Sequence, residues 1–230
     1  TWSGLYFGIK YYRMSQQQRE QVLKATSVAH EAQLRTLRHQ LNPHFLFNTL
    51  NAISTLVLES ENDTADRMLT RLSAFLRSTL DRDPMQKIKL RAEIEALDLY
   101  LDLERLRFDD RLEINLEIEE PAFRSLVPSM ILQPLVENAV RHATTVSEGG
   151  GSITITGQIE DDMLCLSVAD KGPKVASPGN LSIRTKAGVG LANTRERLQV
   201  LYGKAHRFSV KDAPPQGLTV EMCIPLEHDS

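Results

Sequence analysis

The chain has 230 residues, a formal net charge of −3, 41% hydrophobic residues and 25% charged residues. These proportions are typical of a folded globular protein and exclude wholesale disorder. The negative charge argues against nucleic acid as a partner, because phosphate binding needs a basic surface. The two cysteines, Cys165 and Cys223, are too few for a disulfide scaffold or a four-cysteine zinc site, and they fit a reducing compartment.

The first residues have the composition of the end of a membrane helix. Five aromatic residues lie among residues 1–12 together with Lys10, and Arg13 follows. An aromatic belt followed by positive charge is typical of the cytoplasmic end of such a helix. We interpret residues 1–14 as this end and its juxtamembrane segment, which makes the chain the cytoplasmic portion of an inner or plasma membrane protein. The alternative is an aromatic cluster packed on the domain.

A long helical region follows. Residues 15–58 contain one proline and no glycine, which predicts one very long helix or two stacked helices. Residues 15–40 have sparse apolar positions at coiled-coil spacing, typical of a signalling linker. Residues 41–58 are apolar on almost every side, and residues 63–80 form a second helical pattern after a polar connector. Because two helices cannot cover so much apolar surface, we expect the hairpin of residues 41–85 to dimerise as a four-helix bundle.

Asn42 and Pro43 interrupt this region. Proline inside a helix removes a hydrogen bond and clashes with the preceding turn, but Asn followed by Pro is also typical of a helix start. The sequence therefore predicts either a kink or a restart. His44 follows directly and shares a helical stripe with Asn48 and Asn51. A histidine satisfied by Asn48 is one interpretation, and the disturbed turn with its two asparagines favours a reactive imidazole.

The remainder, residues 86–230, mixes helical and strand patterns. Alternation of apolar and polar residues predicts strands at 112–118, 152–158, 163–169, 207–211 and 218–224, and the helical period predicts helices at 91–108, 130–143 and 191–201. Residues 171–187 form a loop rich in Gly, Pro, Ser and Lys. The fold class is therefore α+β.

Three segments of this domain carry residues suited to binding a nucleotide. Asn138 has an amide oxygen that can complete a Mg²⁺ shell beside phosphates, and Arg141 and His142 can neutralise those phosphates. Asp170 follows a strand directly, two residues before Gly172, and can accept a hydrogen bond from an exocyclic amine. Each segment alone also fits an ordinary amphipathic helix or turn.

The third segment is a glycine pair. Gly188 and Gly190 open a predicted helix, where glycines allow the backbone to approach phosphates and aim N–H groups at them. A single pair of this kind is common in proteins. The three segments in this order are much more specific than any one of them.

Together these segments resemble the sensor histidine kinases of the LytS/YehU type. Residues 41–51 resemble the H-box of that family, residues 135–142 the N-box, residues 170–173 the first glycine box and residues 188–198 the second. Residues 100–108 and 127–128 match as well, so the resemblance covers about residues 33–226.

The resemblance implies a dimeric phosphoacceptor hairpin joined to an ATP-binding domain, a Bergerat-type α/β sandwich. It implies that His44 is phosphorylated, that Asn138 holds Mg²⁺ and that Asp170 reads adenine. The remaining nucleotide-binding residues that it implies are Glu137, Arg141, His142, Gly172, Gly188, Gly190, Leu191 and Thr219.

The implied activity is that of a two-component sensor kinase. Autophosphorylation of His44 by ATP precedes transfer to an aspartate of a response regulator of the LytTR type, and a preceding sensor region attaches the protein to the membrane. One alternative is a degenerate kinase that acts as a dimeric scaffold, because Lys171 and Lys174 replace the usual Asn and final Gly of the first glycine box. The other is an ATPase of this fold without phosphotransfer, against which the hairpin argues.

Overall fold

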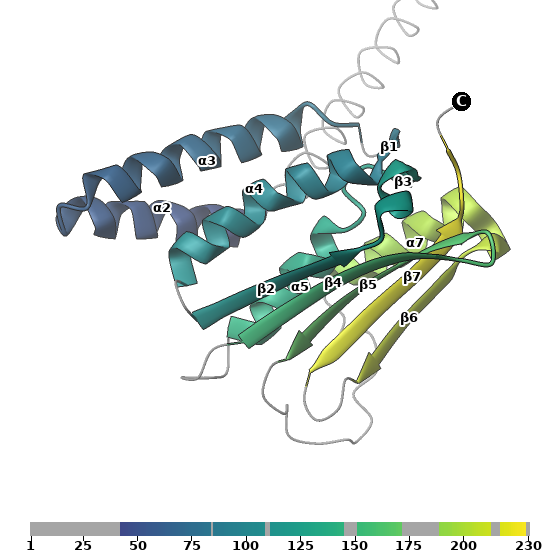
Figure 1. The fold of residues 1–230 in the computed structure, drawn as a ribbon. Helices are drawn as coiled ribbons and strands as arrows, with labels where there is room; N and C mark the ends of the chain where they lie inside the picture. The colour runs from purple at the N-terminus through teal and green to yellow at the C-terminus, as the bar shows by residue number, and fades with distance from the viewer. Residues whose placement is uncertain are drawn as a thin grey trace, which may run out of the picture. The chain divides into compact units, whose positions relative to one another are not determined.

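The computed structural model describes residues 42–83, 85–108, 111–144, 151–171, 189–212 and 217–228 (Figure 1). Its elements, in chain order, are α2 (Pro43–Leu58), α3 (Asn62–Leu80), β1 (Lys87–Lys89), α4 (Leu90–Phe108), β2 (Leu112–Ile118), η2 (Glu120–Arg124), β3 (Leu126–Pro128), α5 (Gln133–Thr144), β4 (Gly151–Glu160), β5 (Met163–Lys171), α7 (Val189–Tyr202), η3 (Gly203–Ala205), β6 (Arg207–Asp212) and β7 (Leu218–Pro225). The predicted α+β class is confirmed. The interpretations of residues 1–14 and 15–40 concern a part of the chain outside the described residues. Among the described helices, none has the length and apolarity needed to cross a membrane.

The chain divides into two compact units, Thr1–Leu50 and Asn51–Ser230. In the second unit, α3 is amphipathic and packs against α4. Its buried side chains recur at steps of three and four, and the ring centroids of Phe75 and Tyr100 lie 6.1 Å apart across the two helices. The helices predicted at residues 63–80 and 91–108 are therefore confirmed, and they pack on each other.

The second unit is built on a five-stranded sheet with the order β2-β4-β5-β7-β6. β2 and β4 are parallel, and the other neighbouring strands are antiparallel. β1 and β3 form a separate antiparallel pair. All five strands predicted for this domain are present, whereas the short pairing of β1 with β3 was not predicted.

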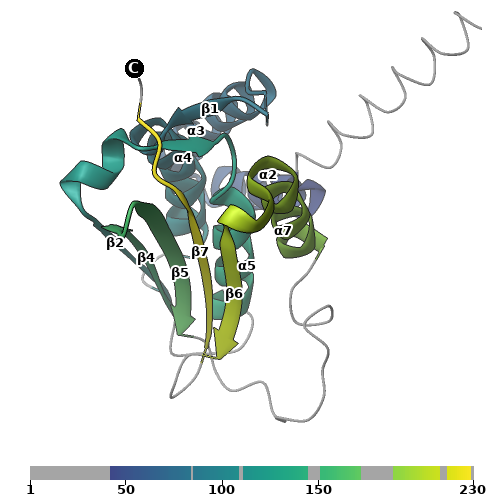
Figure 2. The ribbon, with the colours of Figure 1, turned by 90° about the vertical axis from the view of Figure 1, so that its right-hand side faces the viewer.

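The core lies between the sheet and its helices. Figure 2 shows α5 and α7 along one face of the sheet, and α5 packs on β4, β5 and α7. Alternate residues of the central strands are fully buried under these helices, among them Ile153, Ile155 and Leu164. This two-layer arrangement fixes the face of β5 on which each of its side chains lies.

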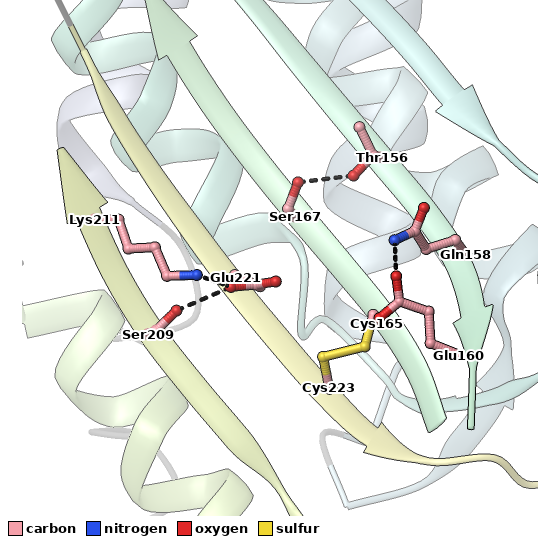
Figure 3. Close-up of a disulfide and its surroundings, with 9 residues drawn as sticks. All are labelled: Thr156, Gln158, Glu160, Cys165, Ser167, Ser209, Lys211, Glu221 and Cys223. Carbon is pink, nitrogen blue, oxygen red and sulfur yellow. Dashed lines mark hydrogen bonds and ion pairs between the residues drawn. A yellow bond between two sulfur atoms is a disulfide. The ribbon is translucent and has the colours of Figure 1, made fainter. Parts of the chain in front are cut away.

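The opposite face of the sheet carries cross-strand polar pairs (Figure 3). The hydroxyl groups of Thr156 and Ser167 are hydrogen-bonded, with their oxygen atoms 2.7 Å apart. The Lys211 Nζ atom lies 2.6 Å from a carboxylate oxygen of Glu221. Cys165 and Cys223 lie directly opposite each other on β5 and β7, with Cα atoms 4.1 Å apart, and form a disulfide. The sequence analysis, which interpreted the two cysteines as fitting a reducing compartment, did not predict this disulfide, because a count of cysteines does not reveal the strand register that brings them together.

α4 buries two carboxylates, which is unusual for a helix next to solvent. Glu93 is 3% exposed and Glu104 is 1% exposed. Arg107 Nη2 lies 2.8 Å from Glu104 Oε2, and the Tyr100 hydroxyl bonds to the same carboxylate. Burial raises the pKa of Glu104 to about 7, helped by the nearby charge of Glu137 and opposed by Arg107 and Tyr100.

This raised pKa predicts a pH-dependent stability. The folded state binds the Glu104 proton more tightly than the unfolded state, so the contribution of this group is present below about pH 4.5 and is lost as the pH rises to about 7. Glu104→Gln removes that loss. We compare the free energy of unfolding of the variant with that of the unmodified chain. The difference in favour of the variant should be about 1–3 kcal/mol larger at pH 8 than at pH 4.5.

Urea unfolding at both pH values measures this difference. Glu95→Gln, at an exposed position of the same helix, is the matched control and should give no pH-dependent gain. Equal behaviour of the two variants would contradict the raised pKa.

Candidate nucleotide-binding and phosphoacceptor sites

α2 begins at the predicted interruption. Asn42 Oδ1 accepts a hydrogen bond from the Phe45 N–H at 3.3 Å, and the Asn42 carbonyl accepts one from the Leu46 N–H at 3.2 Å. These are the bonds of an N-cap residue, with Pro43 at the first helical position. Of the two predicted alternatives, a helix start is therefore the one that the structure supports.

His44 lies in the first turn of α2 and is exposed. Its side chain contacts Asn48, whose Nδ2 atom lies 3.2 Å from Nε2 and 3.3 Å from Nδ1 of the imidazole. The Asn48 amide can donate to whichever ring nitrogen lacks a proton, so both neutral tautomers can accept this hydrogen bond. The contact with Asn48 is the one considered as the alternative to a reactive imidazole, but His44 is exposed, and its reactivity stays a prediction.

α5 carries the predicted polar cluster. Asn138 is 5% exposed, and its Oδ1 accepts a hydrogen bond from Arg141 Nη2 at 2.8 Å. Glu137 Oε1 accepts one from Gln133 Nε2 at 2.9 Å. The pKa of His142 is lowered by burial and by the charge of Arg141, so the imidazole is neutral at pH 7. The neutralisation of phosphates by Arg141 and His142 stays a prediction.

Asp170 is the last buried residue of β5, with 2% of its surface exposed. It lies opposite Ile153 of β4 and on the same face of β5 as Val168, which is under the helices. A Cβ atom on Gly217, where φ is +124°, would lie 1.8 Å from the Asp170 carbonyl oxygen. Glycine at 217 is therefore required for β7 to pass this close to the end of β5.

Thr219 does not join Asp170. The register pairs Thr219 with Ala169, and side chains alternate between faces along a strand, so Thr219 and Asp170 lie on opposite faces of the sheet. The sequence prediction that Thr219 assists Asp170 is therefore corrected. Leu218, which is 7% exposed, precedes Thr219 on β7 and lies on the Asp170 face.

The second glycine segment begins α7. Gly190 lies in its first turn, and a Cβ atom there would be 3.4 Å from Pro134 Cβ, so the beginnings of α7 and α5 are in contact. Leu191 is 2% exposed, and its role in nucleotide binding stays a prediction. The predictions for Gly172 and Gly188 concern positions outside the described residues.

The described residues fit a magnesium nucleotide better than a protein-enclosed metal. No group of three or more His, Cys, Asp or Glu side chains in the described part could hold a metal ion. Mg²⁺ commonly binds through one or two protein oxygens, substrate phosphates and water, and Asn138 offers such an oxygen. The buried carboxylate of Asp170 can accept a hydrogen bond from the exocyclic amine of adenine. Asp170 and α5 lie on the same side of the sheet, because α5 packs on β5.

Two features of this region escaped the sequence analysis. Glu93, which reaches the segment before α5, appeared as one polar residue among many on its helix. Gly217 appeared only as a turn residue. A buried carboxylate and a glycine with positive φ leave no mark on hydrophobic periodicity, which was the signal that located these elements.

The helix start at Pro43 predicts the effect of removing it. Because proline already has the φ angle required at N1, Pro43→Ala should lower the free energy of unfolding by about 0.4–1 kcal/mol or leave it unchanged. Thermal melting measures this, with Asn42→Ala as a comparison that should cost about 1 kcal/mol by removing the cap. A clear rise in melting temperature for Pro43→Ala would instead indicate a kinked continuous helix.

Two family models match the chain. The model described as "Histidine kinase" matches residues 32–112, and the model described as "Histidine kinase-, DNA gyrase B-, and HSP90-like ATPase" matches residues 126–228. The first includes α2 to α4, and the second includes α5, Asp170 and the glycine segments.

Curated relatives agree with these models. Sensor protein LytS of Staphylococcus epidermidis is 32% identical over 204 residues, which cover 86% of this chain and 34% of that protein. Sensor histidine kinase YesM of Bacillus subtilis is 28% identical over 227 residues, covering 97% and 38%. Sensor histidine kinase BtsS of Escherichia coli is 30% identical over 200 residues, covering 87% and 34%. The chain thus spans about a third of the length of these relatives.

Among solved structures, the catalytic domain of histidine kinase ThkA is similar with a TM-score of 0.47 and 16% sequence identity, covering 63% of this chain and 98% of that one. A TM-score this low supports no conclusion by itself. From the two family models and the sensor kinase relatives, the chain belongs to the LytS-type histidine kinase family.

Proposed function

We propose that the chain is the catalytic portion of a two-component sensor histidine kinase, which uses ATP and Mg²⁺ to phosphorylate its own His44. The observation that carries this proposal is the pair of buried polar side chains, Asn138 on α5 and Asp170 on β5, in a region matched by the ATPase family model. The exposed His44 lies in the segment matched by the Histidine kinase model.

Each nucleotide-binding residue has a defined role in this proposal. Asp170 accepts a hydrogen bond from the adenine amine, and Asn138 offers its amide oxygen to the metal. Arg141, one turn along α5, neutralises phosphate charge. Glu137 and His142 complete the polar side of α5, and Gly172, Gly188 and Gly190 belong to the glycine boxes. Bound Mg²⁺ stabilises the negative charge on the phosphate oxygens.

His44 is the nucleophile. Its unprotonated ring nitrogen forms a bond to the γ-phosphorus as the bond from that phosphorus to the β,γ-bridging oxygen breaks and ADP leaves. The proton on the other ring nitrogen passes to water. A neutral imidazole has one unprotonated ring nitrogen, and the Asn48 amide lies within hydrogen-bond distance of both nitrogens of His44. The phosphoryl group then passes to an aspartate of a response regulator.

The hairpin supports a homodimer. Large apolar side chains on α2 and α3 are exposed in the single chain: Phe47 67%, Leu50 47%, Val57 53%, Leu58 85%, Leu69 45% and Leu80 46%. An exposed apolar surface on two successive helices is typical of an interface. A second copy of the chain, forming a four-helix bundle, is the occupant we propose.

This dimer predicts a selective effect of charge. Light scattering at micromolar concentration should give twice the chain mass. Leu58→Asp should give a monomer, because a carboxylate in an apolar interface is costly. Val200→Asp on α7, where the valine is 77% exposed, is the control and should remain dimeric. If the unmodified chain is folded but monomeric, the four-helix bundle is contradicted.

Three finer parts of the proposal rest on the resemblance and on the names of the relatives. The chain lies on the cytoplasmic side of the inner or plasma membrane, a preceding sensor region attaches it to that membrane, and its response regulator is of the LytTR type. Relatives named as sensor proteins support a sensor region, and the membrane, its cytoplasmic side and the LytTR type rest on the resemblance.

The central test is incubation with γ-labelled ATP and Mg²⁺. The unmodified chain should acquire an acid-labile, alkali-stable label, and His44→Gln should lose it. His228→Gln, at another exposed histidine, is the control and should keep the label. ATP hydrolysis without any label would indicate an ATPase of this fold, and nucleotide binding without either reaction would indicate a scaffold.

A further inference from the structure

The segment that leads into α5 has an irregular backbone. Met130 has φ of +59°, a left-handed conformation that is uncommon for a residue with a side chain. Two residues later, the Leu132 carbonyl accepts the N–H groups of Leu135 and Val136, each at 3.0 Å, and so begins the helix. A strained turn directly before a helix needs other contacts to hold it.

Glu93 on α4 supplies those contacts. Its Oε2 accepts a hydrogen bond from the Met130 N–H at 2.8 Å, and its Oε1 accepts one from the Leu132 N–H at 3.1 Å. The first turn of α5 contains no acidic residue of its own. Glu93 therefore provides, from another helix, the hydrogen-bond acceptors for backbone N–H groups just before α5.

Two arginines surround this carboxylate. Arg82, between α3 and β1, has Nη1 3.5 Å from Glu93 Oε2 and donates from Nη2 to the Ala92 carbonyl at 3.0 Å. Arg197 on α7 donates from Nη2 to the Ser129 carbonyl at 2.8 Å, and its charge acts on Glu93. The start of α5 is thus held from α4, from α7 and from the segment after α3.

The consequence concerns one half of the nucleotide site. Asn138 and Arg141, which we propose for the metal and the phosphates, lie on α5 within about three turns of Leu132. Asp170, which we propose for adenine, lies on β5 and is anchored by strand pairing. If the start of α5 is loosened, Asn138 and Arg141 move, whereas Asp170 stays in place.

We propose that Glu93 is a positioning residue for the phosphate- and metal-binding half of the nucleotide site, acting through the backbone of Met130 and Leu132. This inference rests on the proposed function. Glu93 does not touch the nucleotide, and its removal acts on affinity through the placement of α5.

The test compares two probes by titration of the full chain. ATP with Mg²⁺ reads the whole site by calorimetry, and adenosine reads the adenine half by NMR shift changes. Glu93→Gln, whose amide group donates where the carboxylate accepted, should weaken ATP·Mg²⁺ binding about 10–100-fold, the range known for residues that orient metal ligands. Adenosine affinity should stay within about twofold.

Two further variants frame this result. Glu95→Gln, exposed on the same helix, should bind both probes like the unmodified chain. Asp170→Asn should lose adenosine affinity, which shows that this probe reads the adenine half. If Glu93→Gln does not fold, Arg82→Gln is tested in its place. That variant keeps both backbone hydrogen bonds to Glu93 but removes the neighbouring arginine charge. It should give a smaller loss of ATP·Mg²⁺ affinity, again with adenosine affinity unchanged.

Three outcomes overturn the inference. Unchanged ATP·Mg²⁺ binding by Glu93→Gln shows that the carboxylate does not position the site, and an equal loss for both probes shows a general structural role. An unmodified chain that binds neither probe contradicts the proposed function itself, and the inference with it.

Discussion

The packing of α5 on β4 and β5 is the contact on which the candidate nucleotide site depends. It brings the elements that carry Asn138 and Asp170 together, although 31 residues lie between the two in the sequence. Both polar side chains are almost fully buried, which is costly unless each has partners. The apolar stripe of α5 and the alternating interior of the sheet provide the burial energy that holds them there.

The end of β5 is the second fixed point of this layer. Antiparallel pairing with β4 and β7 defines which face Asp170 occupies, and the missing side chain at Gly217 lets β7 pass its carbonyl. The same register determines the position of Thr219 on the other face and joins Cys165 to Cys223. One set of strand pairings therefore explains a binding residue, an excluded residue and a disulfide.

Most elements of this fold could be predicted from periodicity, and the candidate site residues from short motifs. α3, α4 and the five strands of the sheet lie within a few residues of their predicted positions because each has a clear apolar face. The alternatives at Pro43, the face of Thr219 and the pairing of the cysteines could not be decided, because they depend on capping bonds and on strand register. Asn138 was predicted on a polar face, and its burial comes from neighbouring elements that are distant in sequence.

α4 connects the parts of the second unit through buried charge. Phe75 of α3 packs on Tyr100, the Tyr100 hydroxyl bonds to Glu104, and the charge of Glu137 on α5 reaches that carboxylate. At the other end of the same helix, Glu93 holds the backbone before α5. Removing the partners of either carboxyl group would raise its pKa further and leave buried oxygens without hydrogen bonds, which costs more than the loss of an exposed ion pair. The backbone before α5 is therefore bound to α4 by two hydrogen bonds to one carboxylate, and α3 packs on that same helix.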